Sequence, residues 1–197
     1  LELQKSIGLP ERAEVPMISI ISRLTEQKGL DLVKAVIHEI LTDDIQLVIL
    51  GKGDYEYEEF FSQLEKRHPG KVRTLLCYNK DLSKNIYAAS DIFLMPSKTE
   101  PCGLSQMVAL RYGSIPIVRE TGGLKDTVEA YNHETKTGRG FTFKTYNSYD
   151  MLDAVWRAYA CFFDKDNWKA VTDNAMKGDY GWDASAKQYI KIYKNIK

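Results

Sequence analysis

The chain has 197 residues, of which 44% are hydrophobic and 27% charged, so it can bury the core of a folded domain. Its 27 Lys and Arg residues balance 27 Asp and Glu residues, which argues against nucleic acid as a partner. No apolar run approaches the roughly 20 residues that a membrane span needs, so we expect no membrane partner either.

The cysteines and histidines give no sign of a metal or redox site. The three cysteines form no CxxC pair, and the three histidines are not spaced as metal ligands. We therefore expect reduced thiols, no metal and a cytoplasmic location. The chain starts without Met and without a signal-peptide h-region, so we expect a piece cut from a longer protein.

Apolar strands alternate with amphipathic helices along the first half of the chain. Short apolar, β-branched runs predict strands over 16–22, 45–51 and 71–78. Apolar residues at helical spacing predict helices over 30–41, 55–70 and 81–90, with Asp81 as a candidate N-cap.

The second half continues this alternation before it becomes helical. Strands are predicted over 91–97 and 114–120, and a strand or hairpin over 138–143. A helix over 103–113 is expected to end at Gly113, and "TGGLKD" (121–126) to form a turn. Helices are predicted from about residue 148 onward, over 148–163, 168–176 and 182–196.

These elements predict one α/β domain over 1–197, a doubly wound parallel sheet with helices on both faces. In such sheets ligands bind beyond the carboxyl ends of the strands. That rule directs attention to four loops: "RLTEQKG", "GKGD", "CYNKD" and "SKTEPCG".

The first of these loops carries two cations beside a helix start. Arg23 and Lys28 flank it and Gly29 precedes the helix, an arrangement that suits an anion such as a pyrophosphate. The alternative is an ordinary solvated loop in which Lys28 neighbours Glu26. The "GKGD" loop lacks the full GxGxxG fingerprint, so its glycines predict only a tight turn and a close backbone approach.

The stretch "EPCGL" offers a bare backbone at the start of a helix. Pro101 is expected in the first helical turn, where its missing N–H costs nothing. Because Gly103 has no side chain, the N–H groups of Gly103, Leu104 and Ser105 can face an anion.

Glu100 stands just outside this helix start, where it can accept hydrogen bonds from the hydroxyl groups of a ligand. The alternative is that Glu100 only complements the helix dipole. Cys102 is expected to be a small packing residue, because no sequence partner indicates a nucleophile. "TGGLKD" either lines the same cleft or is simply a turn.

Four motifs in a fixed order carry a resemblance to a known family: "SRLTEQKGLDLV", "LGKGD", "YAASDIFLMPSKTEPCGLSQMVALRYGSIPIV" and "RETGGLKDTV". With the closing "GDYGWDASAKQYIKIY", they resemble the C-terminal half of bacterial glycogen synthases and plant starch synthases over nearly the whole chain. The resemblance implies a retaining GT-B glycosyltransferase with two Rossmann-like domains. It also implies transfer of glucose from ADP-glucose to the non-reducing end of an α-1,4-glucan.

The resemblance further implies roles for individual residues. Arg23 and Lys28 would bind the donor phosphates and offset the charge on departing ADP, and Glu100 would hold the glucose hydroxyls. These three are the implied catalytic residues, and no metal or other cofactor is implied. The other implied donor contacts are Tyr78 beside the adenine, Cys102 and Gly103 through their backbones, and Leu104 and Ser105 through N–H groups at the distal phosphate.

The chain departs from the family pattern at Ser105, which stands where Thr is usual, and in its length. Val108 stands where related glycosyltransferases have a ribose-binding Glu, as is expected for the glycogen synthase branch, so no ribose contact is assigned. The N-terminal, acceptor-side domain of the family is absent, so we expect this chain to bind nucleotide without transferring glucose. Two alternatives stay open: a GT-B transferase that uses UDP-glucose, and a non-catalytic nucleotide-binding module.

Overall fold

The computed structural model describes residues 1–196, and its centre is one six-stranded sheet in the order β3-β2-β1-β4-β5-β6. Every neighbouring pair of strands is parallel. The prediction of a doubly wound, Rossmann-like sheet is confirmed. The strands are β1 (Met17–Ile21), β2 (Gln46–Leu50), β3 (Val72–Leu75), β4 (Ile92–Met95), β5 (Ile115–Arg119) and β6 (Phe141–Phe143).

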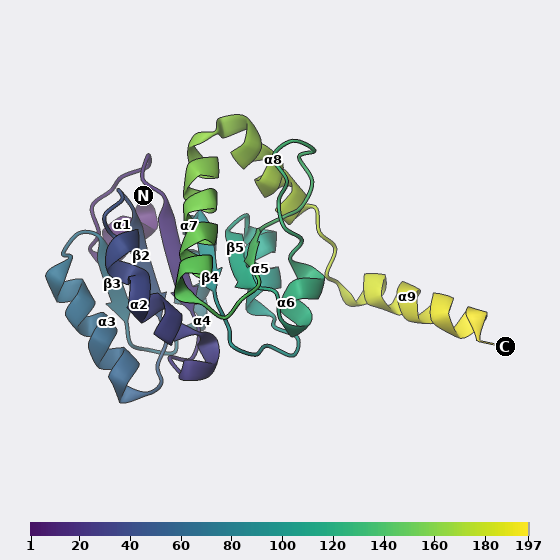
Figure 1. Cartoon of the computed structure of the whole chain (residues 1–197), viewed down its shortest axis with the longest axis horizontal. Coiled ribbons are helices and arrows are strands. Elements are labelled where there is room, and N and C mark those ends of the chain that lie inside the picture. Colours follow the sequence, from purple (N-terminus) through teal and green to yellow (C-terminus); the bar gives the residue numbers. More distant parts are fainter. Residues whose placement is uncertain (197) are drawn as a thin grey trace.

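Helices cover both faces of this sheet (Figure 1). In β2, Leu47 and Ile49 join the larger hydrophobic cluster with residues of α2 and α3, whereas Val48 and Leu50 join a smaller cluster with α1 and α4. Successive side chains of a strand point to opposite faces, so both faces are buried and the strands are apolar throughout. The helices before the C-terminal segment are α1 (Glu2–Ile7), η1 (Glu26–Lys28), α2 (Leu30–Ile40), α3 (Tyr55–Arg67), α4 (Lys80–Ala89), α5 (Ser105–Tyr112), α6 (Gly122–Thr127), α7 (Ser148–Phe163) and α8 (Lys165–Met176).

Several predicted boundaries were wrong, and side-chain capping explains two of them. Helix α4 is capped by Asn79, not Asp81, because the Asn79 side chain accepts the N–H of Leu82 at 3.0 Å. Helix α8 begins at Lys165 rather than at residue 168, because the Asp164 side chain accepts the N–H of Asn167 at 3.1 Å. Strand β3 is shorter than predicted. For 138–143 either a strand or a hairpin was predicted, and the strand is confirmed, since β6 pairs with β5 in parallel.

Two elements were not predicted as helices. Helix α1, to which the sequence assigned no element, buries Leu3 and Ile7 against the α4 side of the sheet. The stretch 121–126, predicted as a turn, lies almost wholly in helix α6, which spans Gly122–Thr127. Both helices have only six residues, so they offer little of the periodicity that reveals longer ones.

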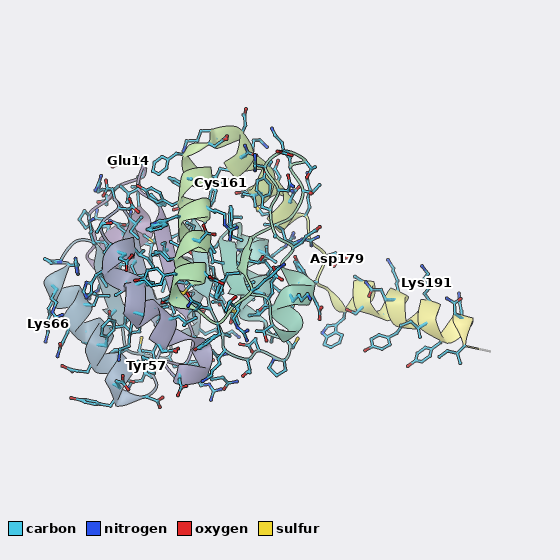
Figure 2. All side chains as sticks on the ribbon, viewed as in Figure 1. Glu14, Tyr57, Lys66, Cys161, Asp179 and Lys191 are labelled. Atoms are coloured by element: carbon cyan, nitrogen blue, oxygen red, sulfur yellow. The ribbon has the colours of Figure 1, made fainter. Side chains whose placement is uncertain are left out.

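Helix α9 (Trp182–Asn195) projects away from the body of the molecule (Figure 1). None of its residues is buried, and Figure 2 shows its side chains, with Lys191 labelled, clear of the other helices. Across residues 1–196 there is no helix with both the length and the apolar character that crossing a membrane would require.

The amino ends of β1 and β4 are joined through a sheltered carboxyl group. The N–H of Met17 donates to Oδ2 of Asp91 at 2.8 Å, and the N–H of Asp91 donates to the carbonyl of Met17 at 3.0 Å. Burial raises the pKa of the Asp91 carboxyl to about 6, against the opposing effect of its backbone hydrogen bonds. The charged form of Asp91 is therefore unfavourable in the folded chain.

We expect Asp91→Asn to stabilise the chain by about 1–3 kcal/mol near neutral pH. The folded chain binds the Asp91 proton more tightly than the unfolded chain does. The protonated Asp91 carboxyl group therefore makes its full contribution to the free energy of unfolding below about pH 4. This contribution is lost as the pH rises through about 6. Asparagine keeps an oxygen for the Met17 N–H and has no such loss. Urea denaturation from about pH 4 to 7.5 should show a flatter profile for this variant.

The matched control is Asp183→Asn on the exposed helix α9, which should leave the pH profile of the wild type unchanged. Equal pH profiles for Asp91→Asn and the wild type would contradict the assignment of this pH dependence to Asp91.

Candidate functional site

The candidate site lies at the carboxyl edge of the sheet, where strand order reverses between β1 and β4. The chain builds β1, β2 and β3 outward on one side and then returns to place β4 on the other side of β1. The loops after β1 and β4 diverge to helices on the two faces, and this leaves a crevice between them. All of the predicted site residues stand in loops at this edge or at the helix starts that follow.

Lys28 and Glu100 form an ion pair across this crevice. The Lys28 Nζ donates to Glu100 Oε2 at 2.5 Å, and the Ser97 hydroxyl donates to the same oxygen at 3.2 Å. Only 16% of the Lys28 side chain and 12% of the Glu100 side chain are exposed. Such shelter reduces screening by water, so the pair interacts more strongly than one on the open surface. Two residues predicted separately thus form one charged centre.

A glycine allows the two loops to come this close. Gly29 has a φ of 72°, and a Cβ on it would lie 2.0 Å from the carbonyl oxygen of Pro96. No other residue fits both the backbone conformation and the contact. The N–H of Lys98 then donates to the carbonyl of Gln27 at 2.9 Å and ties the two loops together.

Arg119 supports the loop after β4 from the neighbouring strand. Its Nε donates to the carbonyl of Ser97 at 3.1 Å and its Nη2 to the carbonyl of Lys98. The Tyr146 ring lies 5.4 Å from the Arg119 guanidinium, and its hydroxyl donates to Asp31 Oδ1 at 2.5 Å. Burial, and then the bond to Asp31, raise the pKa of Tyr146. The contacts of Arg119 and Tyr146 were not predicted from the sequence. The one signal for them was the position of Arg119, a cation at the end of an apolar strand.

The helix that follows Glu100 starts later than predicted. Helix α5 begins at Ser105, so Pro101 lies before the helix and not in its first turn. Gly103 has a φ of 75° and reverses the chain ahead of the helix. Within residues 1–196, the N–H groups of Gly103, Leu104 and Ser105 donate to no backbone or side-chain acceptor. They form a group of free donors at a helix N-terminus, which suits an anion.

Cys102, in the same loop, is exposed and carries a free thiol, so it is not the small packing residue that we expected. Its Sγ lies 3.6 Å from the carbonyl oxygen of Gly103.

Helix α6 packs against the loop between β4 and α5. A Cβ on Gly122 would lie 2.2 Å from the carbonyl oxygen of Glu100, and one on Gly123 would lie 2.2 Å from that of Cys102. The N–H of Gly123 donates to the carbonyls of Glu100 and Pro101 at 3.2 and 3.1 Å. "TGGLKD" is therefore no simple turn, because its two glycines let a helix pack directly against the loop.

Arg23 and Tyr78 lie at a separate part of the same edge. Both line a hollow of about 410 Å³ beyond β1, β2 and β3, and 93% of Tyr78 is exposed. Gly51 lines it, and the loops after β1 and β2 lie close together there, since a Cβ on Gly51 would lie 1.9 Å from the Ser22 carbonyl oxygen and one on Gly53 2.2 Å from the Leu24 carbonyl oxygen. The predicted close backbone approach is confirmed.

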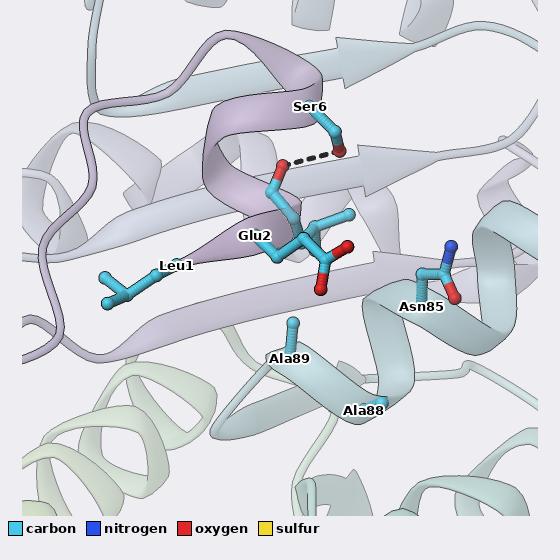
Figure 3. A pocket seen from close by; sticks show the side chains of 7 residues that line it. Leu1, Glu2, Ser6, Asn85, Ala88 and Ala89 are labelled. Atoms are coloured by element: carbon cyan, nitrogen blue, oxygen red, sulfur yellow. Dashed lines mark hydrogen bonds between the residues drawn. The ribbon is translucent and has the colours of Figure 1, made fainter.

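A hollow of about 440 Å³ between α1 and α4 is unrelated to these residues (Figure 3). Its walls include Asn85 and Ala89, and Ala89 ends α4 just before β4 begins, at the amino edge of the sheet. Within residues 1–196, no three His, Cys, Asp or Glu side chains gather into a group that could hold a metal ion. The prediction that no metal takes part stays a prediction.

Comparison with known proteins gives this geometry a family context. A family model described as "Glycosyl transferases group 1" matches residues 4–167. A glycogen synthase of Geobacillus thermodenitrificans (strain NG80-2) is 52% identical over 194 residues, which are 98% of this chain and 40% of that protein. A glycogen synthase of Bacillus anthracis is 51% identical over 98% of this chain and 41% of its own length. The chain thus spans about two fifths of these relatives.

The structural comparison gives the same context. The catalytic domain of starch synthase IV from Arabidopsis thaliana, bound to ADP and acarbose, superposes with a TM-score of 0.88 at 38% identity. The match covers 98% of this chain and 41% of that one. A sucrose-phosphate synthase of Thermosynechococcus elongatus, at 21% identity and a TM-score of 0.71, shares the fold.

A double-mutant cycle should reveal the coupling between Lys28 and Glu100. Lys28→Met alone leaves a sheltered carboxylate without its cation, and Glu100→Gln alone leaves a sheltered ammonium. We expect the losses in the free energy of unfolding of the two single variants, added together, to exceed the loss of the double variant. The difference, which is the coupling free energy, should be about 1–3 kcal/mol by urea denaturation.

Lys34 and Glu56 provide the matched control, because they also form a Lys–Glu pair but 72% of the Glu56 side chain is exposed. Lys34→Met with Glu56→Gln should give a coupling free energy below about 0.5 kcal/mol. Equal coupling in the two cycles would show that the crevice does not strengthen the Lys28–Glu100 pair.

Proposed function

The chain belongs to the glycosyl transferases group 1 family, and we propose that it is the donor-binding part of a glycogen or starch synthase. In this proposal the whole enzyme transfers glucose from ADP-glucose to the non-reducing end of an α-1,4-glucan, with retention at the anomeric carbon, in the cytoplasm. The observation that carries the proposal is the Lys28–Glu100 pair beside the free N–H groups at the start of α5.

This pair has the chemistry that an activated sugar requires. A nucleoside diphosphate sugar presents a dianionic diphosphate next to a neutral, hydroxyl-rich ring. Lys28 can turn from Glu100 to the diphosphate, and Glu100 is then free to accept hydrogen bonds from the sugar hydroxyls. Ser97 keeps one hydrogen bond to Glu100 throughout this exchange. Donor binding therefore gives each of the two charged groups a new hydrogen-bonding partner.

The diphosphate would be held from two sides. Arg23 and Lys28 supply cations from the loop after β1, and Leu104 and Ser105 supply N–H groups from α5. Gly103 and Cys102 contribute backbone contacts next to the sugar. These groups stabilise negative charge as it develops on the leaving diphosphate, which is the work a metal ion performs in other transferases.

The hollow beside Tyr78 fits the nucleoside end of the donor. It lies beyond the same strands, and an exposed aromatic ring on its rim can stack on a base. The ADP bound to the starch synthase IV domain of Arabidopsis thaliana supports adenine as the base. The glucan acceptor would bind to the part of the protein outside these 197 residues.

We expect the 197-residue chain to bind ADP with a dissociation constant of roughly a millimolar or below and UDP more weakly. The Arg23→Ala, Lys28→Ala double variant should lose most of the ADP affinity, because both cations face the phosphates. Isothermal titration calorimetry measures the three dissociation constants: those of ADP and UDP for the wild-type chain, and that of ADP for the double variant. The chain alone should transfer no glucose from ADP-glucose to glycogen.

Arg67→Ala with Lys191→Ala is the matched control, since it also removes one Arg and one Lys, from exposed positions outside the proposed donor site. Stronger binding of UDP than ADP would favour the UDP-glucose alternative. ADP binding with no glucosyl transfer, after the chain is joined to the remaining length of a related glycogen synthase, would favour a non-catalytic module.

A further inference from the structure

Gln106 is a buried polar residue on the inner side of the loop that starts α5. It lies in the first turn of the helix and none of its surface is exposed. Its Nε2 donates to the carbonyl of Cys102 at 3.1 Å, to the carbonyl of Gly103 at 3.0 Å and to the Thr127 hydroxyl at 3.1 Å. The Thr127 hydroxyl in turn donates to the carbonyl of Gly123 at 2.6 Å. The amide thus joins the loop to helix α6.

These bonds fix the direction of the loop's N–H groups. In a trans peptide the C=O and the N–H point in opposite directions. The carbonyl of Cys102 shares its peptide with the N–H of Gly103, and the carbonyl of Gly103 shares its peptide with the N–H of Leu104. Because Gln106 draws both carbonyls inward, both N–H groups must point outward.

The amide head of Gln106 has one possible orientation in this environment. The opposite orientation would bring Oε1 against two carbonyl oxygens, which repel it. The observed orientation leaves Oε1 buried with no donor among residues 1–196. Tolerating an unpaired buried oxygen is unfavourable, so the contacts made by Nε2 must outweigh that cost. Gly103 keeps space for this head, since a Cβ on it would lie 2.5 Å from Oε1.

We propose that Gln106 is a positioning residue that selects a nucleoside diphosphate over a monophosphate, by turning the N–H group of Leu104 toward the distal phosphate and that of Gly103 outward beside it, next to the sugar. This inference rests on the proposed function, in which the distal phosphate meets the start of α5. Gln106 itself touches no ligand. A monophosphate has no group at that position, so its affinity does not depend on how the loop is held.

The test compares ADP and AMP binding to the 197-residue chain by calorimetry. Gln106→Met keeps the length and volume of the side chain but donates no hydrogen bond. We expect it to weaken ADP binding about tenfold, while AMP affinity stays within about twofold of the wild type. A merely structural role would change the two affinities by the same factor, and that result would overturn the inference.

Thr127→Val is the matched control, since it removes a buried hydrogen bond of the same amide but leaves both bonds to the loop carbonyls. It should lower the melting temperature with little change in the ratio of ADP to AMP affinity. If Gln106→Met does not fold, Gln106→Asn gives the same measurement, because its amide is one methylene too short to reach both carbonyls.

The outcomes separate the two proposals. A wild-type chain that binds neither ADP nor AMP overturns the proposed function, and this inference with it. A wild-type chain that prefers ADP, with the same preference in Gln106→Met or Gln106→Asn, overturns the role of Gln106 alone. A selective loss of ADP affinity in the Gln106 variants, absent from Thr127→Val, supports the role of Gln106.

Discussion

The contact between the loops that leave β1 and β4 governs this structure, and the ion pair of Lys28 and Glu100 is its centre. The two residues stand 72 positions apart in the chain. Two sheltered charges of opposite sign satisfy each other in the absence of a ligand, so the crevice does not hold an unpaired charge. The same pairing leaves both groups ready for a ligand that has an anionic part and a hydroxyl-rich part.

Backbone contacts, more than side chains, bring this centre together. Three glycines lie so close to carbonyl oxygens of the loop after β4 that a Cβ would not fit on any of them: Gly29, Gly122 and Gly123. Arg119 and Gln106 then bind carbonyls of that loop from two different sides. The loop is therefore held by groups that do not need to contact a ligand themselves. Such support keeps the hydrogen-bond donors of the loop aligned before negative charge develops on a bound ligand.

Only part of the enzyme's proposed chemistry belongs to this chain. In the proposed function the residues described here bind and orient the donor, and this chain spans about two fifths of the length of the related glycogen synthases. The exposed helix α9 and the exposed rim of the hollow at Tyr78 lie outside the buried core.

The sequence by itself determined the fold and the loops of the site. Buried parallel strands and amphipathic helices leave strong local hydrophobic patterns, and strands 16–22 and 45–51 were predicted to within a residue at each end. The topology rule then placed Arg23, Lys28, Tyr78 and Glu100 at one edge of the sheet. The tertiary structure alone decided which groups meet. Neither the Lys28–Glu100 ion pair nor the hydrogen bonds from Gln106 to the loop carbonyls can be predicted from a local sequence pattern. Both depend on distances between segments, and these are fixed only when the strands align and the glycines let the loops touch.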